Sequence, residues 1–395
     1  MTHSRWPGRR LARALAALLM LAGAISAIGL ARAAAAPAGG CENWTGTQPP
    51  DPGGSNTLDS VAIVSACDAW AVGFQAGNGM DLTLTEHWNG SAWTVVPSPN
   101  PGSVNLLRSV RGVSPADVWA VGEYIDGSMD KTLILHWDGR TWTQVTSPNP
   151  GSAGSQLFGV RPVSGTDAWA VGDIDTGTTD QTLILHWDGS AWTQVTSPSP
   201  GTGDLLSAVA ATSSIDAWAV GTRFTATGSQ TLTLHWNGSK WARVPSPNRG
   251  TSNRLFDVKG TSSSDTWAVG ISVIGGVDQT LALHWNGHTW ARVNTPDPGG
   301  PGVSSSLVGV TATSATSAWA VGVTAPGASA GGRAVIRNST LIMHWDGSGW
   351  TRVPSPNAGI SSQLFAVASS SAGNIWAAGI FSDGESDHAF AVHCC

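Results

Sequence analysis

The segment from Leu107 to Gly151, LRSVRGVSPADVWAVGEYIDGSMDKTLILHWDGRTWTQVTSPNPG, is one copy of a unit that recurs along the whole chain. Its WA(V/A)G tetrapeptide returns at spacings of 49, 50, 49, 49, 52 and 57 residues, with the tryptophan at Trp70, Trp119, Trp169, Trp218, Trp267, Trp319 and Trp376. A fixed period of this length indicates an array of identical supersecondary units. The fold therefore depends on what one such unit can form.

Each unit contains four short apolar segments separated by turn-forming residues. In the copy above, the segments are LLRSVRGV, VWAVGEYI, TLILHW and TWTQV, and Asp138-Gly139 between the last two is typical of a tight hairpin. The SPNPG that follows ends the pairing, because proline has no amide hydrogen to donate. Four antiparallel strands per unit predict one blade of a β-propeller, and seven units predict an all-β, seven-bladed ring.

The two ends of the repeat region complete one unit. The last copy stops at Cys395, after its third segment, and the missing fourth segment stands at residues 41–53, where Trp44 aligns with Trp93. We therefore predict that residues 41–53 form the fourth strand of the seventh blade and close the ring. The predicted organisation is a signal peptide at 1–33, a linker at 34–40 and a propeller at 41–395, with blades that begin near residues 58, 107, 157, 206, 255, 307 and 364.

The repeat resembles that of the kelch and galactose-oxidase type of propeller. The similarity lies in WAVG, which matches the family's aromatic-apolar-glycine strand, and in HWDGRTW, which matches its aromatic residue, turn and following tryptophan. The chain departs from the family pattern in having one glycine in place of a glycine pair. The resemblance implies the propeller architecture and no particular activity.

Composition and the N-terminal segment indicate export. Only 12% of residues are charged, and the net charge of −6 is spread without runs, which argues against nucleic acid or an anionic membrane as a partner. Four arginines precede an apolar stretch at 14–30, and Ala31-Arg32-Ala33 offers a cleavage site. We expect a secreted monomer cleaved near Ala33, with no membrane insertion. An uncleaved anchor and twin-arginine export through Arg9-Arg10 are the alternatives.

Four cysteines in an exported chain predict two disulfides. The alignment of the two ends places Cys41 beside Cys395, and the first-blade turn that holds Cys67 lies on the same side of the ring. We predict the pairs Cys41–Cys395 and Cys67–Cys394, with the exchanged pairing as the alternative. Lipidation of Cys41 is a competing interpretation.

Repeated histidines and tryptophans are assigned to structure. One histidine per blade cannot converge on a single metal ion, so we expect each to bond within its blade to a turn residue such as Asp68. The recurring histidines are His87, His136, His186, His235, His284, His344 and His393. The tryptophans, three in most blades, are expected to fill the interfaces between blades.

No catalytic motif of a known kind is present. Galactose-oxidase chemistry needs tyrosines as copper ligands, and the chain has one, Tyr124. No cofactor is expected. A calcium-like fragment, Asp173-Ile-Asp175-Thr-Gly-Thr-Thr-Asp180, has oxygen ligands at alternate positions but lacks the closing glutamate, so we regard it as a weak metal candidate.

Departures from the repeat point to one side of the ring, which we call the loop face because it bears the connections between strands two and three and between strands four and one. Insertions at 295–306 and 324–338 belong to this face, as do the candidate ligand-binding residues Glu123, Tyr124, Asp173, Arg223, Arg254, Arg333, Arg337 and Glu385. Loops around the centre of a ring are common binding sites. We expect a non-catalytic module that binds a glycan, an envelope polymer or a protein. A polysaccharide hydrolase or lyase that uses loop-face carboxylates, and a scaffold without a small ligand, are the alternatives.

Overall fold

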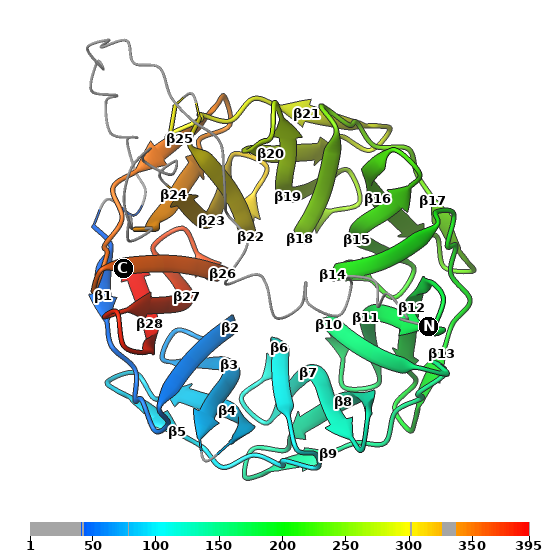
Figure 1. Ribbon diagram of the computed structural model, residues 1–395, viewed down its shortest axis with the longest axis vertical. Coiled ribbons are helices and arrows are strands. Elements are labelled where there is room, and N and C mark those ends of the chain that lie inside the picture. Colours follow the sequence, from blue (N-terminus) through cyan, green and yellow to red (C-terminus); the bar gives the residue numbers. More distant parts are fainter. Residues whose placement is uncertain (1–40, 42, 78, 301, 326–336, 395) are drawn as a thin grey trace, which may run out of the picture.

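The predicted β-propeller is confirmed by the computed structural model, which describes residues 41, 43–77, 79–300, 302–325 and 337–394 (Figure 1). Twenty-eight strands form seven four-stranded blades around a central axis. The signal peptide and linker predicted for residues 1–40 lie outside the described residues. No helix in the described part of the chain is long and apolar enough to cross a membrane.

The strands occupy the same places in every blade. The innermost strands are β2 (Ser55–Ser65), β6 (Asn105–Ser114), β10 (Gly154–Ser164), β14 (Gly203–Ser213), β18 (Ser252–Ser262), β22 (Ser304–Ser314) and β26 (Ser361–Ser371). The second strands are β3 (Asp68–Gly77), β7 (Asp117–Asp126), β11 (Asp167–Asp175), β15 (Asp216–Thr225), β19 (Asp265–Ile274), β23 (Ser317–Ala325) and β27 (Asn374–Ser382).

The third strands are β4 (Met80–Trp88), β8 (Met129–Trp137), β12 (Asp180–Trp187), β16 (Gly228–Trp236), β20 (Val277–Trp285), β24 (Ser339–Trp345) and β28 (Asp387–Cys394). The outermost strands are short: β5 (Trp93–Val95), β9 (Trp142–Gln144), β13 (Trp192–Gln194), β17 (Trp241–Arg243), β21 (Trp290–Val293), β25 (Trp350–Val353) and β1 (Thr45–Thr47). The N-terminal strand β1 pairs with β28 in the register Thr45↔His393, so the blade at the C-terminus takes its fourth strand from the other end of the chain.

Tryptophans fill the interfaces between blades, as the repeat predicts. Trp70 of the first blade is completely buried and lies 4.8 Å from Trp137 and 5.1 Å from Trp142 of the second blade, measured between ring centroids. The same arrangement recurs around the ring, and Trp376 of the last blade contacts Trp88 and Trp93 of the first blade. Large aromatic surfaces buried in this way supply most of the apolar contact between neighbouring blades.

Six of the seven recurring histidines bond to the turn residue of their own blades, which confirms their structural interpretation. His87 stacks on Trp70 with 4.5 Å between ring centroids, and its Nε2 lies 3.0 Å from Asp68 Oδ1. Equivalent bonds to the turn residue form at His136, His186, His235, His284 and His393. In the sixth blade Ser317 replaces the aspartate, and burial lowers the pKa of His344.

The predicted disulfide pairing is wrong in its first choice. Cys41 is bonded to Cys394, as in the alternative pairing, and Cys67 is free and exposed; Cys395 lies outside the described residues. Cys394 takes the place of the third tryptophan of the blade, so its side chain is buried beside Cys41. Cys67 instead lies against Gly90 in its own blade. The disulfide indicates an oxidising environment for the protein.

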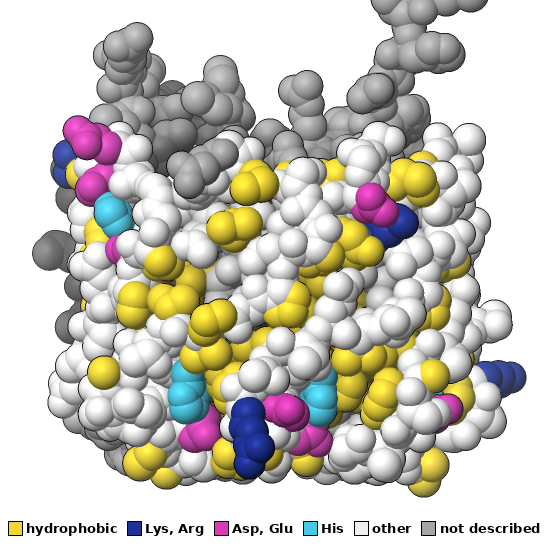
Figure 2. Space-filling model, turned by 90° about the horizontal axis from the view of Figure 1, so that it is seen from below, with side chains coloured by type: hydrophobic (Ala, Val, Ile, Leu, Met, Phe, Trp, Pro, Cys, Tyr) yellow, Lys and Arg dark blue, Asp and Glu magenta, His cyan; other side chains and the backbone are white. Residues whose placement is uncertain are grey.

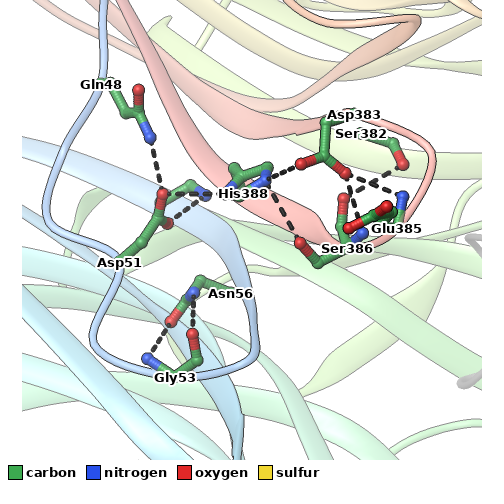
Figure 3. Close-up of polar contacts among 10 residues, drawn as sticks. Gln48, Asp51, Gly53, Asn56, Ser382, Asp383, Glu385, Ser386 and His388 are labelled. Carbon is green, nitrogen blue, oxygen red and sulfur yellow. Dashed lines mark hydrogen bonds and ion pairs between the residues drawn. The ribbon is translucent and has the colours of Figure 1, made fainter.

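A histidine joins the N-terminal segment to the last blade (Figure 3). His388 of β28 lies between two carboxylates, with its Nδ1 3.1 Å from Asp51 Oδ2 and its Nε2 3.0 Å from Asp383 Oδ2. Asp51 also accepts a hydrogen bond from the Ala389 amide, as Asn100 does from Thr83 in the first blade. The hydrogen bond to Asp383, reinforced by Asp51, raises the pKa of His388 above its ordinary value.

An ionisable group is also buried at the interface between the first and last blades. Glu86 stands where other blades have Leu135, Leu185 or Leu234 and has no exposed surface. Neither of its carboxyl oxygens has a hydrogen-bond partner in the described structure. Burial, assisted by the charge of Asp51, raises the pKa of Glu86 to about 8. Its carboxyl group is therefore protonated at neutral pH.

The Cys41–Cys394 bridge should be a major contributor to stability, because it joins residues 353 positions apart. We expect the C41S/C394S variant to lose about 2–5 kcal/mol of unfolding free energy, measured by denaturant titration. The matched control C67S should unfold like the original protein, because Cys67 forms no disulfide among the described residues. Equal stability of C41S/C394S and C67S would contradict this assignment.

Both Glu86 and His388 should make the protein less stable as the pH rises. The unfolded chain ionises Glu86 from about pH 4.5 upward while the folded chain does not until about pH 8, so this loss spans that interval. The contribution of His388 is complete below about pH 6.5 and is lost as the pH passes its higher folded-state pKa. We therefore expect the melting temperature of E86L to fall less than that of the original protein between about pH 4.5 and 8, and that of E86L/H388Q to fall less than that of E86L above about pH 6.5. Equal falls for E86L and E86L/H388Q above about pH 6.5 would contradict the role of His388.

Candidate functional site

Buried carboxylates mark two neighbouring blades at the loop face. The residue after the WAVG glycine is bulky and apolar in four blades, but it is Glu123 in the second blade and Asp173 in the third. Both lie in the half of their strand that leads to the loop face, where they pair with Leu106 and Gln156 of the innermost strands. Sequence analysis selected both residues, and the structure shows that their surroundings differ.

Glu123 belongs to a buried ion-pair network. Arg108 Nη2 donates to Glu123 Oε1 at 2.8 Å, and Arg108 Nη1 donates to Asp59 Oδ2 of the preceding blade at 2.8 Å. Each of the three side chains is less than one fifth exposed. Arg108 and Asp59 were not among the residues predicted from the sequence. They occupy one repeat position that holds Phe158, Phe256 or Phe365 in other blades. A charged residue at a position that is aromatic in other blades was the feature of the sequence that could have indicated them. Glu123 is thus bound to the framework between two blades.

Asp173 has no such counter-charge. Burial raises the pKa of its carboxyl group well above the ordinary value, and the nearby carboxylates Asp180, Glu123, Asp175 and Asp130 raise it further. Its Oδ1 atom is buried without a hydrogen-bond partner in the described structure. The raised pKa favours the protonated form of this carboxyl group, and that form can donate a hydrogen bond.

The calcium-like fragment forms a turn. Asp175 Oδ1 accepts the amide of Gly177 at 2.7 Å, and Thr176 bonds to Thr179 across the same turn. Among the described residues, no three His, Cys, Asp or Glu side chains converge in a way that could hold a metal ion. Asp173, Asp175 and Asp180 therefore give no support to a calcium site, and a protonated Asp173 would be a poor ligand.

The next two blades continue the polar surface. In the fourth blade, Arg223 is paired in register with Asp204, and its Nη1 donates to Gln230 Oε1 at 3.3 Å. Burial raises the pKa of Asp204 to about 6. Asp204 Oδ1 and Arg223 Nε are both buried without a hydrogen-bond partner in the described structure. These two side chains hold opposite charges close together without satisfying each other's hydrogen bonds.

In the fifth blade, Arg254 and Asp278 influence each other across the sheet. Burial lowers the pKa of Arg254, and Asp278 offsets part of this effect. Burial likewise raises the pKa of Asp278, with Arg254 acting in the opposite direction. The third, fourth and fifth blades, which are consecutive in the ring, thus hold a set of polar residues that we call the polar arc and define as Asp173, Asp204, Arg223, Arg254 and Asp278.

The other predicted site residues lie apart from the polar arc. Tyr124 is half-buried and packs against the core of the second blade, beside Gly102. Arg337 is exposed before β24, and Glu385 is exposed in the β27–β28 turn. Arg333 and most of the insertion at 324–338 lie outside the described residues. The structure therefore places Asp173, Arg223 and Arg254 on three consecutive blades, with Glu123 and Tyr124 on the blade before them and Arg337 and Glu385 on the sixth and seventh blades.

The outer wall of the propeller offers less polar chemistry. Figure 2 shows one side of the molecule, on which charged side chains are few and are grouped near the two faces, with hydrophobic side chains between them. The half-buried tryptophans of the third strands bond locally, as Trp137 does to the carbonyl of Pro115 at 3.1 Å. Among the described residues, this side of the ring therefore follows the repeat and gives no sign of a specialised site.

The Arg108 network should be structural, and its disruption should be costly. R108M leaves Asp59 and Glu123 buried without their counter-charge, and we expect a loss of about 3–5 kcal/mol of unfolding free energy. The triple variant D59N/R108M/E123Q should recover much of that loss, because it buries no uncompensated charge. R140Q, in an exposed turn, is the matched control and should change stability by less than about 0.5 kcal/mol. An R108M protein as stable as R140Q would contradict the network's role.

No protein-family model and no curated protein matches the sequence. Among solved structures, the chain is similar to YCF48 bound to D1 peptide, with a TM-score of 0.54, 15% identity and coverage of 89% of this chain and 96% of that chain. It is also similar to streptogramin B lyase, with a TM-score of 0.58, 12% identity and coverage of 90% and 99%. A polysaccharide lyase, the PL25 ulvan lyase, has a TM-score of 0.51, 8% identity and coverage of 87% and 95%. This likeness shows the propeller fold, but not membership of the kelch and galactose-oxidase family.

Proposed function

We propose that the protein is an extracellular, non-catalytic binding propeller that takes a polar ligand at the loop face, on the polar arc. The observation on which this depends is the set of buried atoms without partners, Asp173 Oδ1, Asp204 Oδ1 and Arg223 Nε, in neighbouring blades. Buried polar groups in proteins are nearly always hydrogen-bonded, so such a set favours a ligand that completes the bonds.

The chemistry of the polar arc favours a hydroxyl-rich or amide-rich ligand. A protonated Asp173 donates a hydrogen bond, Asp204 accepts one, and Arg223 and Arg254 donate several each. A glycan, an envelope polymer or an extended peptide presents donors and acceptors in a similar alternation. Binding proteins and enzymes both occur among the structural neighbours, as YCF48 with its D1 peptide and the lyases show, so the neighbours are compatible with this proposal and do not select it.

A second candidate function is a polysaccharide hydrolase or lyase. Asp173 favours it, because a carboxyl group with a raised pKa is suited to act as a general acid. The other strongly buried carboxylate nearby, Glu123, is occupied by Arg108 and is a poor partner for acid–base work. We therefore rank binding above catalysis.

The test is binding of the exported protein to an array of glycans, cell-envelope polymers and peptides. We expect saturable binding that falls at least tenfold in D173N/R223Q, because both unpaired groups are altered while side-chain size is nearly kept. R140Q, on the opposite face, is the matched control and should bind normally. Added calcium should have no effect.

Two outcomes would overturn the proposal. Binding that survives in D173N/R223Q would place the ligand elsewhere. Release of shortened products from an array polymer, abolished by D173N, would replace the binding function with the hydrolase or lyase.

A further inference from the structure

A second group of charges lies on the innermost strands, away from the polar arc. Each innermost strand contains a Leu-x-x-Val segment, and the residue directly after its valine is small in four blades. In the other three blades it is a cation: Arg111 in β6, Arg161 in β10 and Lys259 in β18. The other blades have Ala62, Ala210, Thr311 and Ala368. Leu106 pairs with Glu123 near the loop face, and Arg111 stands five residues later on the same strand. The cations therefore lie about 16 Å farther along the strand from the loop face.

These three cations surround one cavity on the axis of the ring. It has a volume of about 80 Å³, and its lining includes residues from all seven innermost strands, the strands that face the centre in Figure 1. Arg111, Arg161 and Lys259 are the charged residues of the lining, and the remainder are small or aliphatic, such as Ala210 and Val310. The cavity can hold a group of only a few heavy atoms.

The cations have few partners of their own. Arg111 Nη1 donates to Ser60 Oγ and to the carbonyls of Val61 and Val110, which fixes its guanidinium group at the cavity. Arg161 Nε is buried with no acceptor. None of the three forms an ion pair in the part of the chain that the structure describes.

The one carboxylate nearby is already occupied. Asp257 Oδ1 accepts the Val258 amide at 2.8 Å, and its Oδ2 accepts the Val310 amide of the next blade at 2.8 Å. In other blades a serine, such as Ser60 or Ser109, accepts the corresponding amide. Asp257 therefore joins two blades and leaves an excess of positive charge at the cavity.

Burial and mutual repulsion lower the pKa values of two of the cations. Burial lowers the pKa of Lys259 to about 7, with Arg161 and Arg111 lowering it further and Asp257 opposing them. Burial and the charge of Arg111 lower the pKa of Arg161 to about 10. Because four of the seven blades have alanine or threonine here, the fold does not need these charges, and an uncompensated cluster is costly unless an anion joins it.

We propose that the axial cavity is a binding site for a small oxyanion of the sulfate or phosphate type, held by Arg111, Arg161 and Lys259. Two guanidinium groups and an ammonium group that converge from three blades match the several oxygens of a tetrahedral anion. The site is independent of the proposed loop-face function, because none of its residues belongs to the polar arc. The anion arrives either as the free ion or as a sulfate or phosphate ester on a larger molecule.

Inorganic sulfate is the probe for the first test, because its charge is constant between pH 6 and 9. At fixed ionic strength maintained with chloride, we expect sulfate to raise the melting temperature of the full chain saturably, with binding confirmed by calorimetry. R161Q/K259M should weaken sulfate binding at least tenfold, and its melting temperature without sulfate should be equal to or higher than that of the original protein, since a repulsive contact is removed. R140Q and D173N/R223Q should bind sulfate normally, which keeps this test separate from that of the loop face.

The pH dependence gives a second, sharper readout. Sulfate affinity should fall as the pH rises through about 7, because the protonated form of Lys259 is the one that binds the anion. K259R should retain binding and lose most of this pH dependence, because arginine stays charged across the range. Tighter binding of a sulfated or phosphorylated monosaccharide than of the free ion would identify the ester as the source, and weaker binding would identify the ion.

Two results would overturn the proposal. One is a sulfate effect no larger than that of chloride at equal ionic strength. The other is sulfate binding that is the same in R161Q/K259M as in the original protein, which would place the anion at another site.

Discussion

The contact on which the rest of the structure depends is the insertion of one buried tryptophan per blade between two tryptophans of the next blade. Trp70 against Trp137 and Trp142 is the pattern, and Trp376 against Trp88 and Trp93 repeats it where the last blade meets the first. Each indole ring is large, rigid and apolar, so the contact fixes both the distance and the angle between neighbouring blades. With the interfaces fixed in this way, the innermost strands and the loops have room to vary.

The last blade shows how this contact is replaced where the repeat fails. Cys394 stands in place of a tryptophan, and a covalent bond to Cys41 takes over the role of holding the outer strand. Trp44 still packs against Trp319 of the sixth blade, at 5.6 Å between ring centroids. The same region contains the Asp51–His388 contact and the buried Glu86, so the junction of the two chain ends combines a strong covalent link with groups that respond to pH.

Polar chemistry occurs where the repeat positions depart from their usual residues. There are two groups of such residues: the polar arc, on the first, second and third strands of three blades, and the three cations, on innermost strands. They differ in character, because the polar arc contains both hydrogen-bond donors and acceptors, whereas the charged residues that line the axial cavity are all cations. A ring of similar blades allows this, because a substitution in one blade can change the residues at the loop face or the axial cavity without disturbing the tryptophan contacts between blades.

The sequence by itself determined the propeller, the number of blades and the structural use of histidine and tryptophan, because each follows from residues that recur at a fixed period. It also indicated Glu123 and Asp173 as departures, but could not separate them: only the tertiary structure places Arg108 beside Glu123 and leaves Asp173 among carboxylates. The choice of Cys394 over Cys395 as the partner of Cys41 depends on which side chain points inward at the end of β28. The convergence of Arg111, Arg161 and Lys259 on one cavity was likewise decided in three dimensions, because residues 50 to 150 positions apart meet only when the ring closes.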